Sequence, residues 1–136
     1  MRSRYIDTTR EIENIISTAD ICFLAMADGD QPYVIPMNFA YEEKKLYLHC
    51  AMTGKKIDIL KKNPNVCFEF EIMTQLIKSA KACKWGMKYE SVIGFGQASL
   101  IADDEDKKRL GFDIIMSQYS DGAFEYEPQA TKAALI

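Results

Sequence analysis

The stretch ICFLAMADGDQPYVIPMNFAYEEKKLYLHC, residues 21–50, decides the fold. It contains three mostly apolar runs, 21–27, 32–41 and 46–50, which are separated by the polar groups DGD and EEKK. An Asp-Gly pair between two such runs is a strong signal for a β-hairpin. The pattern therefore predicts an antiparallel meander of three strands. Pro36 has no backbone N–H to donate, so we expect the middle strand to be an edge strand or to be bulged there.

Helical patterns lie on both sides of this stretch. Thr8 and Glu11 have the spacing of a capping box, and isoleucines follow at helical intervals, which predicts a first helix. Residues 55–62 predict a short second helix with one apolar face, which the Asn-Pro pair ending at Pro64 terminates. Two aspartates at the start of the segment 103–117 predict the cap of a third helix.

Two further strands are expected in the second half of the chain. Residues 65–72 and 89–102 are rich in β-branched and aromatic side chains, whereas the polar segment 73–88 between them reads mostly as a loop. Gly94 and Gly96 within the later strand mark a kink or a close backbone contact.

Five or more antiparallel strands with helices between them predict a mainly β fold with flanking helices, a small closed or split barrel. The 136 residues fit one domain, 1–136. The final TKAALI has the pattern of a strand that is just starting, so a C-terminal strand can be missing from the chain.

Composition excludes several classes of function. The net charge of −3 argues against a nucleic-acid binder, and 48% apolar residues are enough for one filled core. Four cysteines without C-x-x-C spacing indicate reduced thiols, and a single histidine argues against a metal site. The chain has no signal-peptide pattern and no apolar run long enough to span a bilayer. We therefore expect a soluble cytoplasmic protein with no membrane partner.

The segment Thr53-Gly54-Lys55-Lys56 is a candidate anion site, because it places two ammonium groups at the start of a helix. It is not a P-loop, since that motif requires glycine at position 49 and serine or threonine at position 56. The alternative is an ordinary solvated face rich in lysine.

Three other side chains also have two interpretations. His49, the one histidine, ends a predicted strand and is either catalytic or structural. Trp85 and Tyr89 lie on a polar segment that contains glycine, where they either stack on a planar ligand or cover the end of the barrel.

Three motifs occur in a fixed order along the chain: PMNF, LYLHCA-x-x-GKK and W-x-MKY-x-SVIG-x-G. With them the sequence resembles the pyridoxamine 5′-phosphate oxidase-like FMN-binding split barrels, and most closely the nitroimidazole-resistance (Nim) subgroup. The resemblance extends from about Asp7 onward.

The resemblance implies an FMN site. In this family the strand that corresponds to Val34–Asn38 lies beside the flavin ring, the next strand end borders it, and the Thr-Gly-Lys-Lys segment holds the phosphate. The residues implied to contact the cofactor are Val34, Pro36, Met37, Asn38, Leu48, His49, Cys50, Thr53, Lys55, Lys56, Trp85 and Tyr89. His49 is implied to be catalytic, and Trp85 and Tyr89 to close a site, either their own or that of a partner subunit.

The resemblance also implies an activity and an assembly. We expect an FMN-dependent oxidoreductase that transfers electrons from NAD(P)H to a small electrophile such as a nitro compound, in a homodimer with FMN at the interface. The alternative is a flavin- or haem-binding protein that stores or senses its cofactor without turnover. The oxidase proper uses an arginine–histidine pair late in the chain, and no histidine follows His49. The sequence therefore argues against oxidation of pyridoxamine phosphate.

Overall fold

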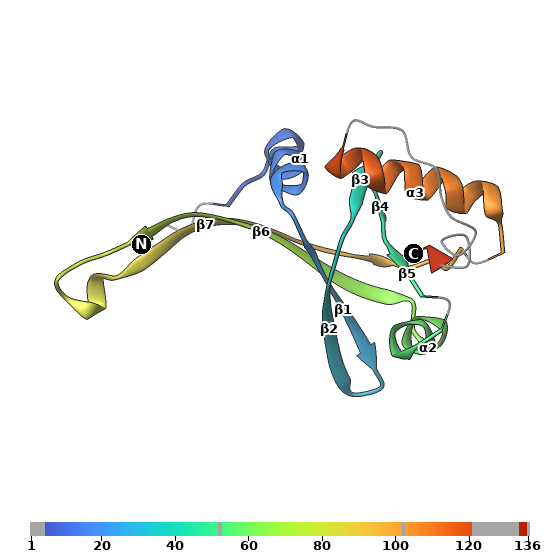
Figure 1. The fold of residues 1–136 in the computed structure, drawn as a ribbon. Coiled ribbons are helices and arrows are strands. Elements are labelled where there is room, and N and C mark those ends of the chain that lie inside the picture. Colours follow the sequence, from blue (N-terminus) through green and yellow to red (C-terminus); the bar gives the residue numbers. More distant parts are fainter. Residues whose placement is uncertain (1–4, 52, 102, 121–133, 136) are drawn as a thin grey trace.

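A four-stranded antiparallel sheet in the order β2-β1-β6-β7 curls into a half-barrel, with three helices around it (Figure 1). The computed structural model describes residues 5–51, 53–101, 103–120 and 134–135. Its elements, in chain order, are α1 (Thr9–Thr18), β1 (Cys22–Asp28), β2 (Gln31–Met37), β3 (Ala40–Glu42), β4 (Lys45–Tyr47), β5 (His49–Cys50), α2 (Lys55–Lys62), β6 (Asn65–Ile77), the short 3₁₀ helix η1 (Ala82–Lys84), β7 (Gly86–Gln97), α3 (Glu105–Tyr119) and β8 (Ala134–Leu135).

The three predicted helices are confirmed. The Oγ1 atom of Thr8 accepts a hydrogen bond from the Glu11 N–H at 3.3 Å, which is the forward half of the expected capping box. Asp104 caps α3 by accepting from the Lys107 N–H at 3.1 Å, and α3 runs two residues further than predicted. Within the described part of the chain, no helix combines the length and apolar content that a membrane crossing requires.

The predicted hairpin is confirmed, but the three-strand meander is wrong. β1 pairs with β2 on one side and with β6 on the other, while β3 and β4 form a separate two-stranded sheet. The predicted strand 32–41 breaks at Asn38–Phe39, where the fully buried Phe39 donates its backbone N–H to the Tyr119 hydroxyl at 3.0 Å. A side chain of α3 therefore takes the hydrogen bond that a continuing strand would need. The turn after β3 is confirmed, with positive φ at Glu43 and Lys44.

The predicted third run, 46–50, also divides into two strands. β4 ends at Tyr47, and β5 begins at His49 and pairs with β8 instead of with β2. The expectation of a strand start near the C-terminus is thus confirmed for Ala134–Leu135, and the remainder of TKAALI lies outside the described residues.

The predicted loop at 73–88 is wrong. β6 continues to Ile77 and β7 begins at Gly86, so the two strands form a long ribbon that projects from the sheet (Figure 1). β1 pairs with β6 only at residues 67–69, so the outer part of the ribbon has two strands. Pairing between the two strands overrides the weak local strand preference of this segment.

β7 also ends earlier than the predicted strand 89–102. The Ala98 N–H donates to the Pro64 carbonyl at 2.8 Å, but Pro64 has no N–H with which to return the bond, so the pairing with β6 stops there. The close contact expected at Gly94 is confirmed. A Cβ atom at this position would lie 2.2 Å from the ring of Phe68 on the adjacent strand.

Replacing Gly94 by alanine is expected to destabilise the fold, because the new methyl group would have to displace an aromatic ring that packs against the core. Overpacking of this kind costs roughly 1–3 kcal/mol. Chemical denaturation of the variant and the wild type measures the difference. Gly96 is the matched control, since a Cβ there would meet Phe68 at an ordinary 3.7 Å. Equal stability of the two alanine variants would contradict this packing.

The core lies between the curled sheet and the first two helices. Ile16 of α1, Leu24 of β1, Ile59 of α2 and Phe70 of β6 belong to one buried cluster. A smaller cluster around Phe112 joins α3 to the β3–β4 sheet. The larger cluster also contains Cys50 of β5 and Ile57 of α2, so the end of β5 and the start of α2 are anchored in the same core.

Candidate functional site

The start of α2 has the features of an anion site. Gly54, the N-cap residue, has φ of +133°, a backbone conformation open mainly to glycine. No side chain among the described residues caps this helix, so N–H groups of the first turn remain available. Lys55 is exposed and Lys56 is half-buried, and both follow Gly54 directly. Asp58 in the same turn offsets part of their positive charge.

Tyr33 brings the β1–β2 hairpin to this helix start. The Nζ atom of Lys55 lies 4.5 Å from the centroid of the Tyr33 ring, within the range of a cation–π interaction. Tyr33 itself is half-buried against the core. The hairpin therefore orients one of the two ammonium groups at the mouth of α2.

His49 faces a different neighbour from the lysines. Its side chain is exposed, and its ring lies edge-on to Phe112 of α3 with centroids 6.3 Å apart. The adjacent Cys50 points into the core. His49 begins β5 and the two lysines begin α2, with the connection 51–54 between the two elements.

Cys50 lies within electrostatic reach of the helix mouth. Burial raises the pKa of its thiol, and the positive charge of Lys56 partly opposes that rise. In β1, burial raises the pKa of Cys22 to about 12, with a smaller contribution from the charge of Glu69. Both thiols are therefore protonated at neutral pH and act as small apolar side chains.

The strand predicted to lie beside the cofactor is an edge strand. β1 and β2 pair in continuous register from Cys22–Met37 to Asp28–Gln31, so the alternative of a bulge at Pro36 is wrong. Because β2 ends the sheet order, the backbone groups on its outer edge have no strand partner among the described residues. Val34 is 59% exposed on the open face of the sheet, Met37 is buried and Asn38 is exposed.

The remaining predicted residues divide into two groups. Leu48 is buried in the core and Thr53 is exposed before α2, so both lie in the β5–α2 region. Trp85 and Tyr89 are 50% and 65% exposed and lie in the projecting ribbon, far from α2 within one chain (Figure 1). The indole N–H of Trp85 donates to the Ser79 carbonyl, which fixes the ring at the tip of the ribbon.

Sequence reasoning missed two aromatic neighbours of the site. Tyr33 and Phe112 carry no local signal of their role, because each is remote in sequence from its partner, Lys55 and His49 respectively. The PYVIPM run marks Tyr33 as a strand residue and nothing more. Only the folded arrangement of the hairpin and α3 reveals these contacts.

Residues 8–134 match the sequence profile of the family described as pyridoxamine 5′-phosphate oxidase. The chain belongs to this family. A proposed 5-nitroimidazole antibiotic resistance protein from Bacteroides thetaiotaomicron is 38% identical and superposes with a TM-score of 0.84, over 96% of this chain and 78% of that one. The resemblance that the three motifs indicate, to the oxidase-like family and its Nim-type members, is therefore confirmed.

Two other proteins resemble the chain less closely. A FAD- and haem-binding protein from Mycobacterium smegmatis has a TM-score of 0.82 at 14% identity, over 94% of this chain and 64% of that one. At this identity the likeness shows the split-barrel fold alone. An uncharacterised protein, RA0666, from Rhizobium meliloti (strain 1021) is 34% identical over 59 residues, which is 43% of this chain and 38% of that protein.

Proposed function

We propose that this protein is an FMN-dependent oxidoreductase that reduces small electrophiles, nitro compounds among them, with electrons from NAD(P)H. The observation that carries the proposal is the uncapped start of α2 with its two lysines, in a chain that is 38% identical to a proposed nitroimidazole resistance protein. Its four cysteines are free thiols, which agrees with a reducing cytoplasm.

The residues at the start of α2 fit a phosphate monoester. The free N–H groups of the first turn can donate to phosphate oxygens, and Lys55 and Lys56 add charge-assisted bonds. The unpaired outer edge of β2 offers backbone donors and acceptors to the polar edge of a planar ring. Val34 and Pro36, both exposed, give that ring an apolar surface.

FMN, when bound, supplies the capacity to take two electrons from NAD(P)H and to release them to the acceptor. A nitro group that takes up two electrons and two protons becomes a nitroso group and releases water. NAD(P)H provides both electrons and one proton as hydride, so one more proton is needed. The exposed imidazole of His49 can hold that proton on a ring nitrogen, donate it to the departing oxygen and regain one from solvent.

A second copy of the chain is proposed to complete the site. Apolar side chains of the open sheet face and the ribbon remain solvent-exposed in one chain, a pattern that marks interaction surfaces. Those exposed include Val34, Trp85, Met87, Tyr89, Ile93 and Phe95. A two-stranded ribbon is marginally stable alone, so it gains from packing on a partner. In such a homodimer Trp85 and Tyr89 of one chain would reach the cofactor of the other.

We expect the wild-type protein to sediment as a dimer and the Ile93→Asp variant as a monomer, because the new carboxylate would lose its hydration in the interface. Leu110→Asp is the matched control, since Leu110 of α3 is 61% exposed and Ile93 is 63% exposed. Analytical ultracentrifugation distinguishes the species. A monomeric wild type, or equal effects of the two substitutions, would rule out this interface.

Tyr33 is expected to aid phosphate binding by holding Lys55 in place. Replacing Tyr33 by leucine removes the ring face, and a cation–π contact of about 0.5–1 kcal/mol corresponds to a loss of roughly two- to fivefold in FMN affinity. Tyr33→Phe keeps the ring and should bind FMN like the wild type. Quenching of flavin fluorescence gives both dissociation constants. Tighter binding by the leucine variant would mean that Tyr33 holds Lys55 away from the ligand.

Turnover separates the enzyme from a binding protein without activity. We expect FMN-loaded protein under anaerobic conditions to oxidise NADH or NADPH faster when a nitroaromatic compound is added. A second candidate function is storage or sensing of flavin or haem without turnover. The exposed imidazole of His49 and the fold shared with a FAD- and haem-binding protein are the observations that support it. Loaded protein that oxidises neither nicotinamide, with or without the acceptor, would support that second candidate.

A further inference from the structure

A cavity of about 670 Å³ lies on the α3 side of the fold and is partly open to solvent. α3, the β3–β4 sheet and the adjoining ends of β6 and β7 surround it. This volume is within the usual range for pockets that hold small organic molecules. Of the twelve residues that the family resemblance assigns to the flavin, Leu48 alone is among the described residues that line it. The cavity is thus separate from the start of α2.

The walls of the cavity are mostly apolar. Leu24, Val66 and Phe68 line it from the sheet, and Ile101 lines it near α3. The hydroxyl of Tyr41, another lining residue, is already engaged, because it donates to Glu13 Oε1 at 3.1 Å. A ligand that fills this space therefore needs an aromatic or aliphatic body.

Positive charge gathers where the apolar walls meet solvent. Lys44, Lys45 and Lys107 line the cavity, and no aspartate or glutamate does so among the described residues. This sign opposes the net charge of −3 of the whole chain. Lys44 is held in the tight turn between β3 and β4 with φ of 61°.

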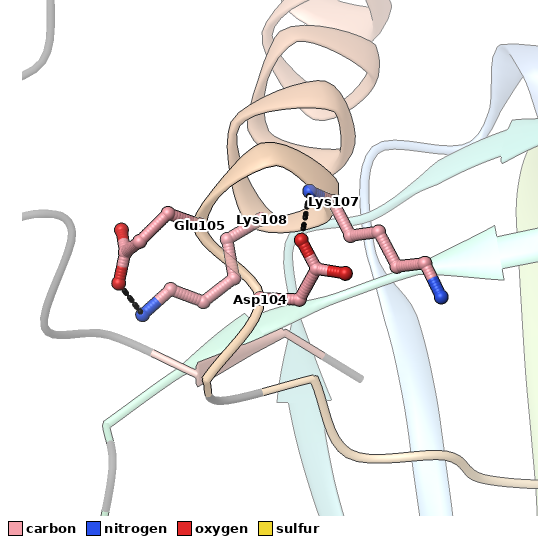
Figure 2. Close-up of polar contacts among 4 residues, drawn as sticks. All are labelled: Asp104, Glu105, Lys107 and Lys108. Atoms are coloured by element: carbon pink, nitrogen blue, oxygen red, sulfur yellow. Dashed lines mark hydrogen bonds and ion pairs between the residues drawn. The ribbon is translucent and has the colours of Figure 1, made fainter.

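Figure 2 shows how the first turn of α3 separates its two lysines. Lys108, which is 2% exposed, turns to Glu105 and lies 3.2 Å from its carboxylate. Lys107 extends on the other side of the turn, and Asp104 is occupied in accepting the Lys107 backbone N–H at 3.1 Å. No ion pair engages the Lys107 ammonium within the described part of the chain.

We propose that this cavity binds a small organic anion, a carboxylate or sulfonate on an aromatic or aliphatic body, at a site distinct from that of the flavin. The apolar body occupies the space between α3 and the sheet. The anionic group lies at the mouth, where Lys44, Lys45 and Lys107 can each donate charge-assisted hydrogen bonds. The proposal does not depend on whether the protein binds FMN or turns over.

The test uses 1-anilinonaphthalene-8-sulfonate as a fluorescent probe of this class, with the full chain saturated with FMN. We expect saturable binding of one probe per chain. Combined replacement of Lys44, Lys45 and Lys107 by alanine should weaken it about tenfold or more, since charge-assisted bonds are lost. The control replaces Lys61, Lys62 and Lys78, which are exposed outside the cavity, and should bind like the wild type.

Competition with two surfactants of equal chain length tests the charge preference. Decanoate should displace the probe at far lower concentration than decylammonium. Equal displacement by the two, equal binding by both lysine variants, or absence of saturable binding would overturn the proposal. In a further control, the FMN-free protein is first loaded with the probe and FMN is then titrated in. Stoichiometric release of the probe by FMN would place the probe in the flavin site and would also overturn it.

Discussion

Replacing Lys55 and Lys56 together by alanine is expected to weaken FMN binding by about two orders of magnitude or more. Each charge-assisted hydrogen bond contributes roughly 1.5–3 kcal/mol, and the two ammonium groups lie next to each other at the uncapped start of α2. The loss should be largest at low ionic strength, because salt screens the remaining attraction of exposed charges. Flavin fluorescence titrations at two salt concentrations measure it.

Lys61 and Lys62 provide the matched control, because they carry the same charge at the opposite end of the same helix. Their double alanine variant should bind FMN with nearly wild-type affinity. Thermal unfolding of the apo forms shows whether either variant loses stability. An unchanged dissociation constant in the Lys55/Lys56 variant would mean that these two residues belong to an ordinary solvated face rich in lysine and do not bind the phosphate.

Replacing His49 by alanine is expected to leave FMN bound but to slow transfer to the nitro acceptor by about 10²–10⁴-fold, the usual contribution of general acid–base catalysis. The imidazole is exposed at the start of β5, where its ring faces Phe112 of α3, whereas the two lysines begin α2. Single-turnover reduction of the acceptor by prereduced protein isolates this step from hydride transfer by the nicotinamide.

His49→Gln serves as the control for hydrogen bonding, because its amide can donate to an oxygen but cannot transfer a proton at neutral pH. We expect it to be as slow as the alanine variant. Wild-type turnover at full flavin occupancy in both variants would make His49 a structural residue that packs on Phe112. Loss of the cofactor itself would make it a ligand instead.

Short sequence patterns correctly predicted the elements that form through interactions between residues close together in the chain. Thr8 caps α1, Asp28-Gly29 closes the first hairpin, and residues 55–62 present the three buried apolar side chains that define α2. These predictions rest on hydrogen bonds and periodicity within a few residues. The candidate phosphate-binding segment is local as well, because Gly54, Lys55 and Lys56 are adjacent in sequence, and its role stays a prediction.

The incorrect predictions all concern contacts between separate segments of the chain, some of them far apart in sequence. The meander fails because Tyr119, eighty residues away, bonds the backbone of Phe39. The loop at 73–88 is a ribbon because its two halves pair with each other. The Tyr33–Lys55 contact and the lysines around the α3 cavity depend on how hairpins and helices meet. No property of an individual residue in the sequence indicates such contacts between elements.

The absorption spectrum of the protein, purified, incubated with excess FMN and separated from free flavin by gel filtration, tests the central claim most directly. We expect two broad visible bands and about one flavin per chain, retained by the wild type and lost by the Lys55/Lys56 double alanine variant. Retention of FAD in preference to FMN would mean that contacts other than those of Lys55 and Lys56 dominate cofactor binding. A protein that stays colourless after FMN is added, or that shows a haem Soret band and no flavin, would contradict the account.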